Sequence, residues 1–238
     1  MIERRLEVLT DAGAVARRAA EVVAAAARGS IEARSSFTFA VSGGRSPRGM
    51  FRELRSLGVA WGRVGIWQVD ERIARDGAPD RNLTDLAAVL PADADLHEMP
   101  VTDQDLATAA ERYAASLPDA FDLIHLGMGD DGHTASLVPD DRVLEVIDRD
   151  VALTSEYRGR RRMTLTYPVL DRARCIVWLI TGHDKAAMLP RLIAGDPSIP
   201  AGRVAARSQD VIADASAASE LDEASRGRSR RGASRPGT

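Results

Sequence analysis

Short apolar runs, bounded by turn residues, alternate along the chain with longer segments in which apolar residues recur at helical spacing. Runs of this kind are typical of β-strands that are buried in a sheet. The four clearest lie at 37–41 (FTFAV), 64–69 (VGIWQV), 121–127 (FDLIHLG) and 175–181 (CIVWLIT). Weaker strand signals occur within 95–101, at 151–154 and at 211–213.

Helices are expected between these strands. The predicted helices cover 11–27 with Asp11 as cap, a segment opened by Ser46 and Pro47, 103–117 with Asp103 as cap, a segment from 182 to about 192, and 215–221. Strands that alternate with helices predict an α/β fold: a mostly parallel, Rossmann-like sheet flanked by helices on both faces. We expect one domain over 1–223. The Arg-, Ser- and Gly-rich residues 224–238 predict a disordered tail.

Composition narrows the function classes. The 238 residues carry a formal net charge of −3 and contain one cysteine, so no intramolecular disulfide can form. Mild acidity argues against general nucleic-acid binding. No stretch approaches the roughly 20 apolar residues that a membrane helix needs. We therefore expect a cytoplasmic protein with a small-molecule partner, no nucleic-acid or membrane partner, and a monomeric or homodimeric state.

The loop SGGRSP at 42–47 has the form of an anion cradle. It follows a predicted strand and opens a predicted helix. Gly43 and Gly44 let the backbone approach a ligand closely, Ser46 is a candidate N-cap, and the free N–H groups of the first helical turn would point at the ligand. An ordinary strand–helix turn with a serine cap would look the same.

Two further turns offer cations. Asp70, Glu71 and Arg72 end the strand at 64–69, and three consecutive charges are not expected to be buried in the sheet. Arg72 suits bidentate contact with a phosphate. Lys185 lies in the first turn of a predicted helix, where it opposes the helix dipole and favours an anionic partner. A solvated loop and a solvent-facing lysine are the alternatives.

The turn GMGDDGHTASLVP at 127–139 gathers the most reactive groups. Asp131 and His133 are two residues apart, so an ordered turn can bring the carboxylate to one imidazole nitrogen. The other nitrogen can then act as a base near neutral pH. A short helix is expected to start at Thr134.

All of these turns follow strands, so they are expected to meet at one edge of a parallel sheet. The chain contains no nucleotide-binding fingerprint, no HExxH and no GxSxG. The pattern therefore favours an enzyme that acts on a small phosphorylated metabolite through base-activated water.

The motifs SGGRSP, VDER, GMGDDGHTASLVP, RMTLTYPVL and TGHDKAAML occur in that order between about residues 6 and 221. Together they resemble the 6-phosphogluconolactonase family, within the glucosamine-6-phosphate isomerase/deaminase-like superfamily. The resemblance implies hydrolysis of 6-phospho-D-glucono-1,5-lactone to 6-phosphogluconate in the oxidative pentose phosphate pathway. It also implies that no metal or organic cofactor is needed.

The resemblance assigns roles to individual residues. His133 would activate water, Asp131 would orient His133, and the glycine-rich turn would offer N–H donors to the tetrahedral intermediate. Substrate and phosphate contacts would come from Ser42, Gly43, Gly44, Ser46, Arg72, Arg162 and Lys185. Asp130 occupies a variable position of the motif and would only be solvated. His125 departs from the family, which usually has an aliphatic residue there.

Three alternatives remain. An isomerase or deaminase of an amino sugar phosphate would need a different acid–base set after the DER strand. A non-catalytic sugar-phosphate sensor would keep SGGRSP but could lose Asp131 and His133. An interaction protein acting through its arginine-rich tail would depend on the last fifteen residues alone.

Overall fold

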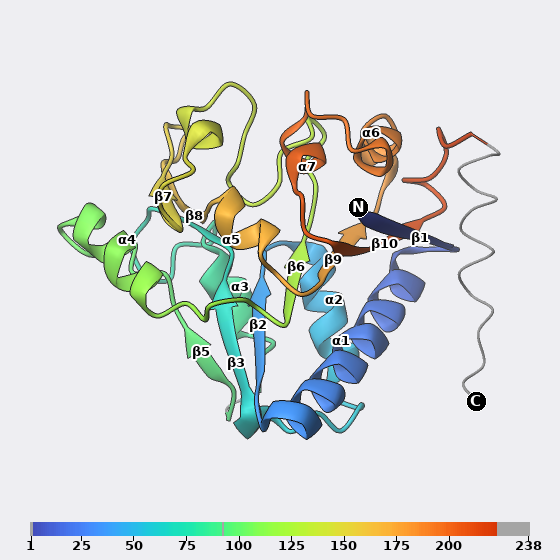
Figure 1. The fold of residues 1–238 in the computed structure, drawn as a ribbon, viewed down its shortest axis with the longest axis horizontal. Coiled ribbons are helices and arrows are strands. Elements are labelled where there is room, and N and C mark those ends of the chain that lie inside the picture. Colours follow the sequence, from blue (N-terminus) through green and yellow to red (C-terminus); the bar gives the residue numbers. More distant parts are fainter. Residues whose placement is uncertain (1, 92, 223–238) are drawn as a thin grey trace.

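A seven-stranded parallel β-sheet runs through the centre of the structure (Figure 1). The structure is a computed structural model that describes residues 2–91 and 93–222, except for the side chain of Arg45. Every pairing between its neighbouring strands is parallel. The strands follow one another in space as β1 (Glu3–Leu9), β10 (Ser208–Asp214), β9 (Ile176–Ile180), β6 (Leu123–Leu126), β2 (Phe37–Val41), β3 (Val64–Gln68) and β5 (Asp95–His97). The predicted fold class is confirmed.

Helices cover both faces of the sheet. One face packs against α1 (Ala12–Arg34) and α2 (Arg45–Leu54), as Figure 1 shows, and α3 (Asn82–Ala87) contributes Leu86 to that layer. The other face packs against α4 (Leu106–Ala115), α5 (Tyr167–Asp171), α6 (Leu189–Ala194) and α7 (Pro200–Arg203). Short 3₁₀ helices occupy Trp61–Arg63, Arg142–Glu145 and His183–Lys185.

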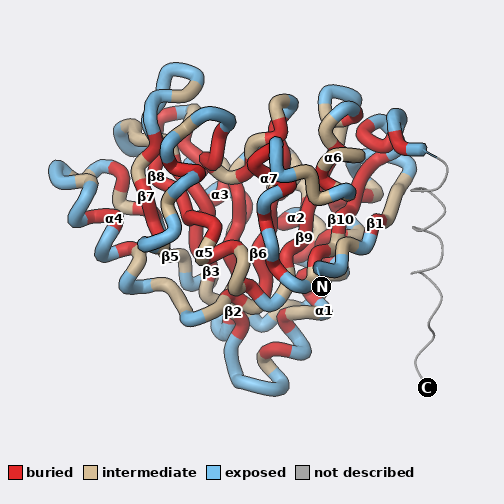
Figure 2. The backbone as a smooth tube through the Cα atoms, turned by 45° about the horizontal axis from the view of Figure 1, so that its top comes forward, coloured by how far each residue is buried: buried red, intermediate tan, exposed pale blue. Residues whose placement is uncertain are grey.

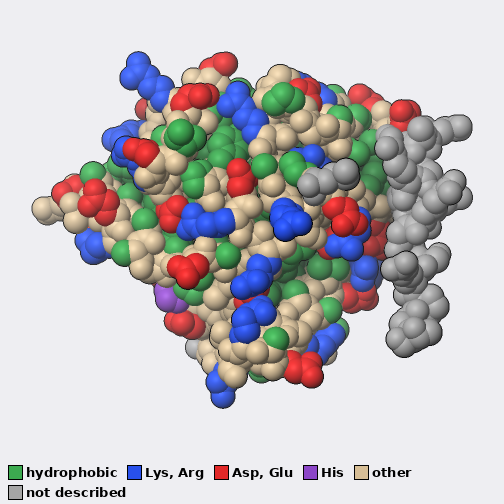
Figure 3. All heavy atoms as spheres, in the orientation of Figure 1, with side chains coloured by type: hydrophobic (Ala, Val, Ile, Leu, Met, Phe, Trp, Pro, Cys, Tyr) green, Lys and Arg blue, Asp and Glu red, His purple; other side chains and the backbone are tan. Residues whose placement is uncertain are grey.

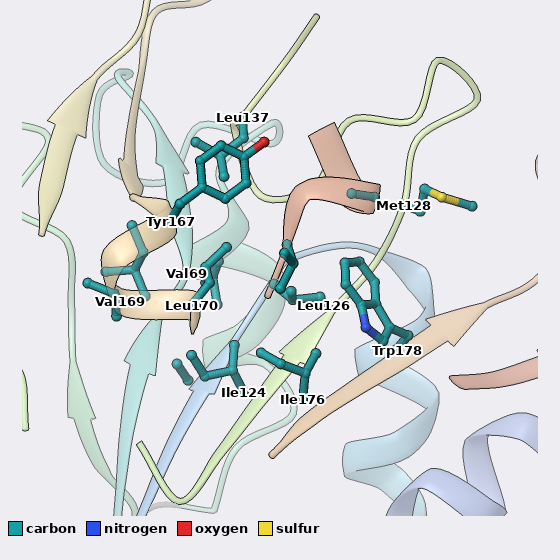
Figure 4. Packing of buried hydrophobic residues seen from close by; sticks show 14 of the residues in the cluster. Val69, Ile124, Leu126, Met128, Leu137, Tyr167, Val169, Leu170, Ile176 and Trp178 are labelled. Atoms are coloured by element: carbon teal, nitrogen blue, oxygen red, sulfur yellow. The ribbon is translucent and has the colours of Figure 1, made fainter. Parts of the chain in front are cut away.

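Strand β9 shows why the central strands are continuous apolar runs. Ile176, Trp178 and Ile180 contact one helical layer, while Val177 and Leu179 contact the other. Both faces of the strand are therefore buried, and a polar residue on either face would need its own partner. Trp178 lies beside Leu126 and Ile176 in the core (Figure 4). Burial is concentrated in these strands, while the outer loops are exposed (Figure 2).

A second, three-stranded antiparallel sheet lies beside the first and was not expected from the sequence. It contains β4 (Asp70–Arg72), β8 (Arg162–Leu165) and β7 (Val151–Leu153), in that order. The chain passes from the large sheet to the small one at Val69, whose N–H donates to the Val41 carbonyl and whose carbonyl accepts from the N–H of Leu165.

The expectation that Asp70 and Glu71 avoid burial is wrong. They are 5% and 0% exposed. Glu71 is satisfied by four donors at 2.8 Å each: the Gln68 amide and the backbone N–H groups of Arg72, Asn82 and Leu83. Two of these N–H groups open α3, so the carboxylate caps that helix from a distant strand.

Several predicted boundaries also change. Helix α1 continues past Ser30, whose hydroxyl donates to Asp122 at 2.8 Å, and it ends at Arg34 with Ser35 as the C-cap at a φ of 64°. Helix α4 is capped by Asp105, not Asp103, through the N–H groups of the next turn. Residues 215–220 form turns instead of a helix. The predicted tail at 224–238 lies outside the described residues.

The surface gives no sign of a preferred charge on the face shown in Figure 3, where acidic and basic side chains are interspersed. Within the described ranges, no helix has both the length and the apolar character required to span a bilayer.

His125 is a polar residue in this apolar interior. It lies on β6 between Val41 and Val177 of the neighbouring strands and is 1% exposed. Among the described residues neither ring nitrogen has a hydrogen-bond partner. Burial lowers the pKa of His125 to about 3, so the imidazole is neutral over the physiological range.

Replacing His125 by Leu is expected to remove part of the pH dependence of stability. Below a pKa of about 6.5 the unfolded chain binds a proton at this residue, whereas the folded chain does not until a pH of about 3. Wild type should therefore lose about 2 kcal/mol of unfolding free energy through this group between pH 7 and pH 5. Urea unfolding at the two pH values measures the loss.

The exposed His183 provides the control, since His183→Leu should lose stability on acidification as wild type does. An identical loss in wild type and His125→Leu would contradict the prediction.

Candidate active site

The predicted site residues lie at the carboxyl ends of parallel strands, where the loops after β2, β6 and β9 meet the small sheet. A cavity of about 150 Å³ is lined there by residues from 42–43, 70–72, 127–135, Asn82 and Arg162. Of the predicted residues it includes Ser42, Gly43, Arg72, His133 and Arg162. Three of the predicted turns, far apart in the sequence, therefore converge at this cavity, as the parallel sheet predicts.

A hydrogen bond joins the predicted acid–base pair. The Nδ1 atom of His133 lies 2.6 Å from Oδ1 of Asp131, and the His133 backbone N–H donates to the same oxygen at 3.1 Å. Because the carboxylate accepts from Nδ1, the proton of the neutral ring resides there and Nε2 is the basic nitrogen. Nε2 has no partner among the described residues, and His133 faces the cavity.

The carboxylate of Asp131 is kept ionised. Burial alone would raise its pKa, but hydrogen bonds from Tyr157 and from the His133 N–H, with the charge of the imidazole, lower the pKa to about 2. An ionised Asp131 stabilises the imidazolium that forms when His133 takes a proton.

Glycine at 129 allows this geometry. A Cβ atom on Gly129 would lie 2.0 Å from Nδ1 of His133 and 2.6 Å from Oδ1 of Asp131. Within the turn, the Gly129 N–H donates to the His133 carbonyl at 2.8 Å, and the Gly132 N–H donates to the Gly129 carbonyl at 3.2 Å. These two N–H groups are thus used inside the turn and are not free to bind an oxyanion.

The segment after His133 is a tight turn, not the expected short helix. The N–H groups of Thr134 and Leu137 donate to each other's carbonyls, and Ala135 has a φ of 52°. Ser136 is 0% exposed, and its hydroxyl donates to Oδ2 of Asp70 at 2.6 Å. Because this hydroxyl is buried and does not line the cavity, Ser136 is not a candidate nucleophile.

Arg72 and Arg162 face each other across the small sheet, as register partners on β4 and β8. Both line the cavity, and among the described residues the Nε–H of each is buried without an acceptor. Arg162 is 6% exposed, and burial lowers its pKa. Like charges placed directly opposite destabilise a sheet. Two such cations with free donors favour an anionic ligand in the cavity.

The remaining predicted contacts line a second cavity of about 700 Å³. It contains Gly44, Ser46 and Lys185, and it shares Gly43, Gly127 and Met128 with the first cavity. The two cavities therefore adjoin along the loop at 43–44 and the start of the 127–139 turn.

The local structure around the second cavity differs from the prediction. Helix α2 begins at Arg45 with Gly44 as N-cap at a φ of 113°, so Ser46 is inside the helix, and its hydroxyl lies 3.3 Å from that of Thr181. Lys185 belongs to a 3₁₀ turn, not to the first turn of an α-helix, and its Nζ lies 2.9 Å from Oδ2 of Asp184.

Tyr157 is the site residue that sequence reasoning missed. Its hydroxyl donates to Oδ2 of Asp131 at 2.7 Å. Several arginines surround it in the sequence, a pattern typical of a solvated face, and the only local signal of a hairpin is the glycine at 159. Asp130 is exposed, as expected, and pairs with Arg158 at 2.8 Å.

No group of three or more His, Cys, Asp or Glu side chains within the described ranges is placed to hold a metal ion. The absence of a metal or organic cofactor stays a prediction.

Comparison with known proteins identifies the family. The profile of the family described as Glucosamine-6-phosphate isomerases/6-phosphogluconolactonase matches residues 10–213. The chain belongs to this family. A member named 6-phosphogluconolactonase from Synechocystis sp. is 33% identical over 206 residues, which cover 80% of this chain and 85% of that protein.

Solved structures of the family show the same fold. The 6-phosphogluconolactonase of Thermotoga maritima superposes with a TM-score of 0.80 at 25% identity, covering 89% of this chain and 100% of the other. A monomeric glucosamine-6-phosphate deaminase superposes with a TM-score of 0.76 at 18% identity, covering 91% and 99%. The fold is thus shared by proteins with different activities, and the residues of the site have to distinguish them.

A substitution of Gly129 by Ala should break the Asp131–His133 hydrogen bond, because the added methyl group would overlap both side chains. A crystal structure of the variant should show the imidazole displaced, and urea unfolding should show a loss of about 1–3 kcal/mol. Gly127→Ala is the matched control, since a Cβ at Gly127 meets no atom within 4 Å. An unmoved His133 in Gly129→Ala would contradict the prediction.

Proposed function

We propose that this protein hydrolyses 6-phospho-D-glucono-1,5-lactone to 6-phospho-D-gluconate, a step of the oxidative pentose phosphate pathway, through water activated by His133. The observation that carries the proposal is a His–Asp pair with a free Nε2 in a cavity that Arg72 and Arg162 also line. The names of the similar family members support the same activity.

In the proposed first step, Nε2 of His133 takes a proton from a water molecule as the water oxygen attacks the lactone carbonyl carbon. The carbonyl electrons move to oxygen and form a tetrahedral oxyanion. Asp131 stabilises the imidazolium through its bond to Nδ1. In the second step the bond between the carbonyl carbon and the ring oxygen breaks, and the imidazolium returns its proton to that oxygen. No covalent enzyme intermediate is formed.

The phosphorylated chain of the substrate would cross from one cavity to the other. The reacting carbonyl lies at His133, and the phosphate reaches the cations, with Arg72 and Arg162 in the first cavity and Lys185 with the loop at 42–46 lining the adjoining space. Since Gly129 and Gly132 use their N–H groups inside the turn, the guanidinium groups of Arg72 and Arg162 are better candidates than these two N–H groups for balancing negative charge on the substrate.

One observation bears on the deaminase alternative: the carboxylate of Asp70 also lines the cavity. Its Oδ2 accepts the Ser136 hydroxyl at 2.6 Å and its Oδ1 accepts the Asn82 amide at 3.3 Å. Both oxygens are thus engaged, whereas Nε2 of His133 is free, which favours hydrolysis. The cytoplasmic location and the monomeric or homodimeric state stay predictions.

Replacing His133 by Ala is expected to lower kcat for freshly prepared 6-phosphogluconolactone by about 10²–10⁴-fold, because the base is lost. A pH-stat or dye-coupled assay measures acid release above the spontaneous rate. His97→Asn is the control, since His97 lies at the outer edge of the sheet and lines neither cavity. A wild-type rate in His133→Ala would contradict the assignment of His133 as the general base. Ammonia release from glucosamine 6-phosphate without lactone hydrolysis would replace the proposal by the deaminase alternative.

The cations should discriminate in favour of the phosphorylated substrate. In wild type kcat/KM for 6-phosphogluconolactone should exceed that for unphosphorylated gluconolactone by at least about 100-fold, since a charge-assisted contact contributes about 1.5–3 kcal/mol. Arg72→Ala and Lys185→Ala should each reduce that ratio about tenfold or more. Arg149→Ala, at an exposed residue away from both cavities, should leave it unchanged. A ratio near one in wild type would contradict phosphate recognition.

A further inference from the structure

A two-residue hairpin between β7 and β8 carries Tyr157 over the catalytic pair. The N–H groups of Tyr157 and Arg160 donate to each other's carbonyls at 2.9 and 3.2 Å. The two residues at the tip, Arg158 and Gly159, have φ values of 50° and 77°. Positive φ at both positions is the geometry of a type I′ turn, which matches the twist of paired strands and holds its flanking residues in place.

Tyr157 completes the hydrogen bonding of Asp131. Its hydroxyl donates to Oδ2 at 2.7 Å, while His133 occupies Oδ1 at 2.6 Å. The phenol oxygen also lies 3.5 Å from Nδ1 of His133, and the two rings meet edge to face with centroids 5.5 Å apart. The carboxylate is therefore held from both sides, and rotation about its side-chain bonds would break one contact or the other.

The ring of Tyr157 is itself held by cations. The guanidinium of Arg158 lies 5.1 Å from the ring centroid and that of Arg162 lies 5.0 Å from it. Arg158 is tied in turn to Asp130 at 2.8 Å. Since Arg162 also lines the cavity, a continuous set of contacts connects a substrate-facing cation to the acid of the pair.

We propose that Tyr157 is a positioning residue for the reaction described above: its hydroxyl holds the Asp131 carboxylate in the orientation that directs Nε2 of His133 into the cavity. This inference rests on the proposed lactonase function. Tyr157 touches Asp131 and acts on the substrate only through His133.

The ionisation of the groups fits this role. Burial first, and then the bond to Asp131, raise the pKa of Tyr157 to about 12, so the phenol remains a donor over the working range. The charged or titratable groups that face Tyr157 and Asp131 come from the 127–139 turn, the hairpin and β8: Asp130, His133, Arg158 and Arg162.

The test is Tyr157→Phe, which removes only the hydroxyl and keeps the ring between the two arginines. We expect kcat for 6-phosphogluconolactone to fall about tenfold with KM within twofold, since one hydrogen bond to a charged group is lost. The acid limb of the kcat/KM–pH profile should move to higher pH. Without the phenol hydroxyl, the Asp131 carboxylate loses one of its hydrogen-bond donors, so its negative charge attracts the imidazolium more strongly. In an Asp131→Asn background the same change should cost less than about twofold.

A second readout does not depend on activity. ¹⁵N NMR of the His133 imidazole, without substrate, should show a titration midpoint at higher pH in Tyr157→Phe than in wild type. Tyr113→Phe is the control: its hydroxyl donates to the Gln68 carbonyl at 2.9 Å in the core under α4, so this variant should lose stability but keep the wild-type midpoint.

The outcomes separate the two proposals. Unchanged NMR midpoints and kcat in Tyr157→Phe, or an equal loss in the Asp131→Asn background, would overturn the positioning role. If the wild-type protein has no lactonase activity but the NMR midpoint of His133 still moves in Tyr157→Phe, the proposed function is wrong. The role of Tyr157 in orienting the Asp131–His133 pair is then retained.

Discussion

The site depends on a backbone that passes too close to His133 for any side chain. The imidazole of His133 and the carboxylate of Asp131 occupy the space where a Cβ on Gly129 would lie. The turn is closed by its own N–H groups, and Ile199 would meet a Cβ on Gly132 at 2.7 Å from the far side. The position of His133 thus depends on the absence of a side chain at Gly129 as much as on the hydrogen bonds of the imidazole.

Charge is distributed unevenly around this turn. The carboxylates of Asp70 and Glu71 are buried and fully engaged in hydrogen bonds, whereas the neighbouring Arg72 and Arg162 retain unpaired donors. The acids hold the small sheet against α3. This difference between the acids and the arginines supports the proposal of a negatively charged substrate.

The sequence predicted the features that depend on local pattern. Continuous apolar runs located β2, β3, β6 and β9, and the turns after them contained His133, Asp131 and the cations that line the cavities. A parallel sheet brings such turns to one edge, so the convergence followed from the fold class.

Features set by tertiary contacts were missed. The burial of Asp70 and Glu71 depends on donors from α3 and from the 127–139 turn, which no local pattern reveals. Tyr157 sits in an arginine-rich segment that reads as solvent-exposed, and its contact with Asp131 spans 26 residues. The unsatisfied His125 breaks the apolar pattern of its strand without any compensating group nearby in the sequence.

The sheet order ties the two ends of the described chain together. Strand β1 lies at the edge and pairs with β10, and the contact between Arg4 and Gln209 joins residues 205 positions apart. During synthesis β1 therefore emerges well before β10 and cannot pair in the sheet until β10 has left the ribosome. Its pairing closes the longest loop in the fold, so the assembly of this edge belongs to the late, slow events of folding.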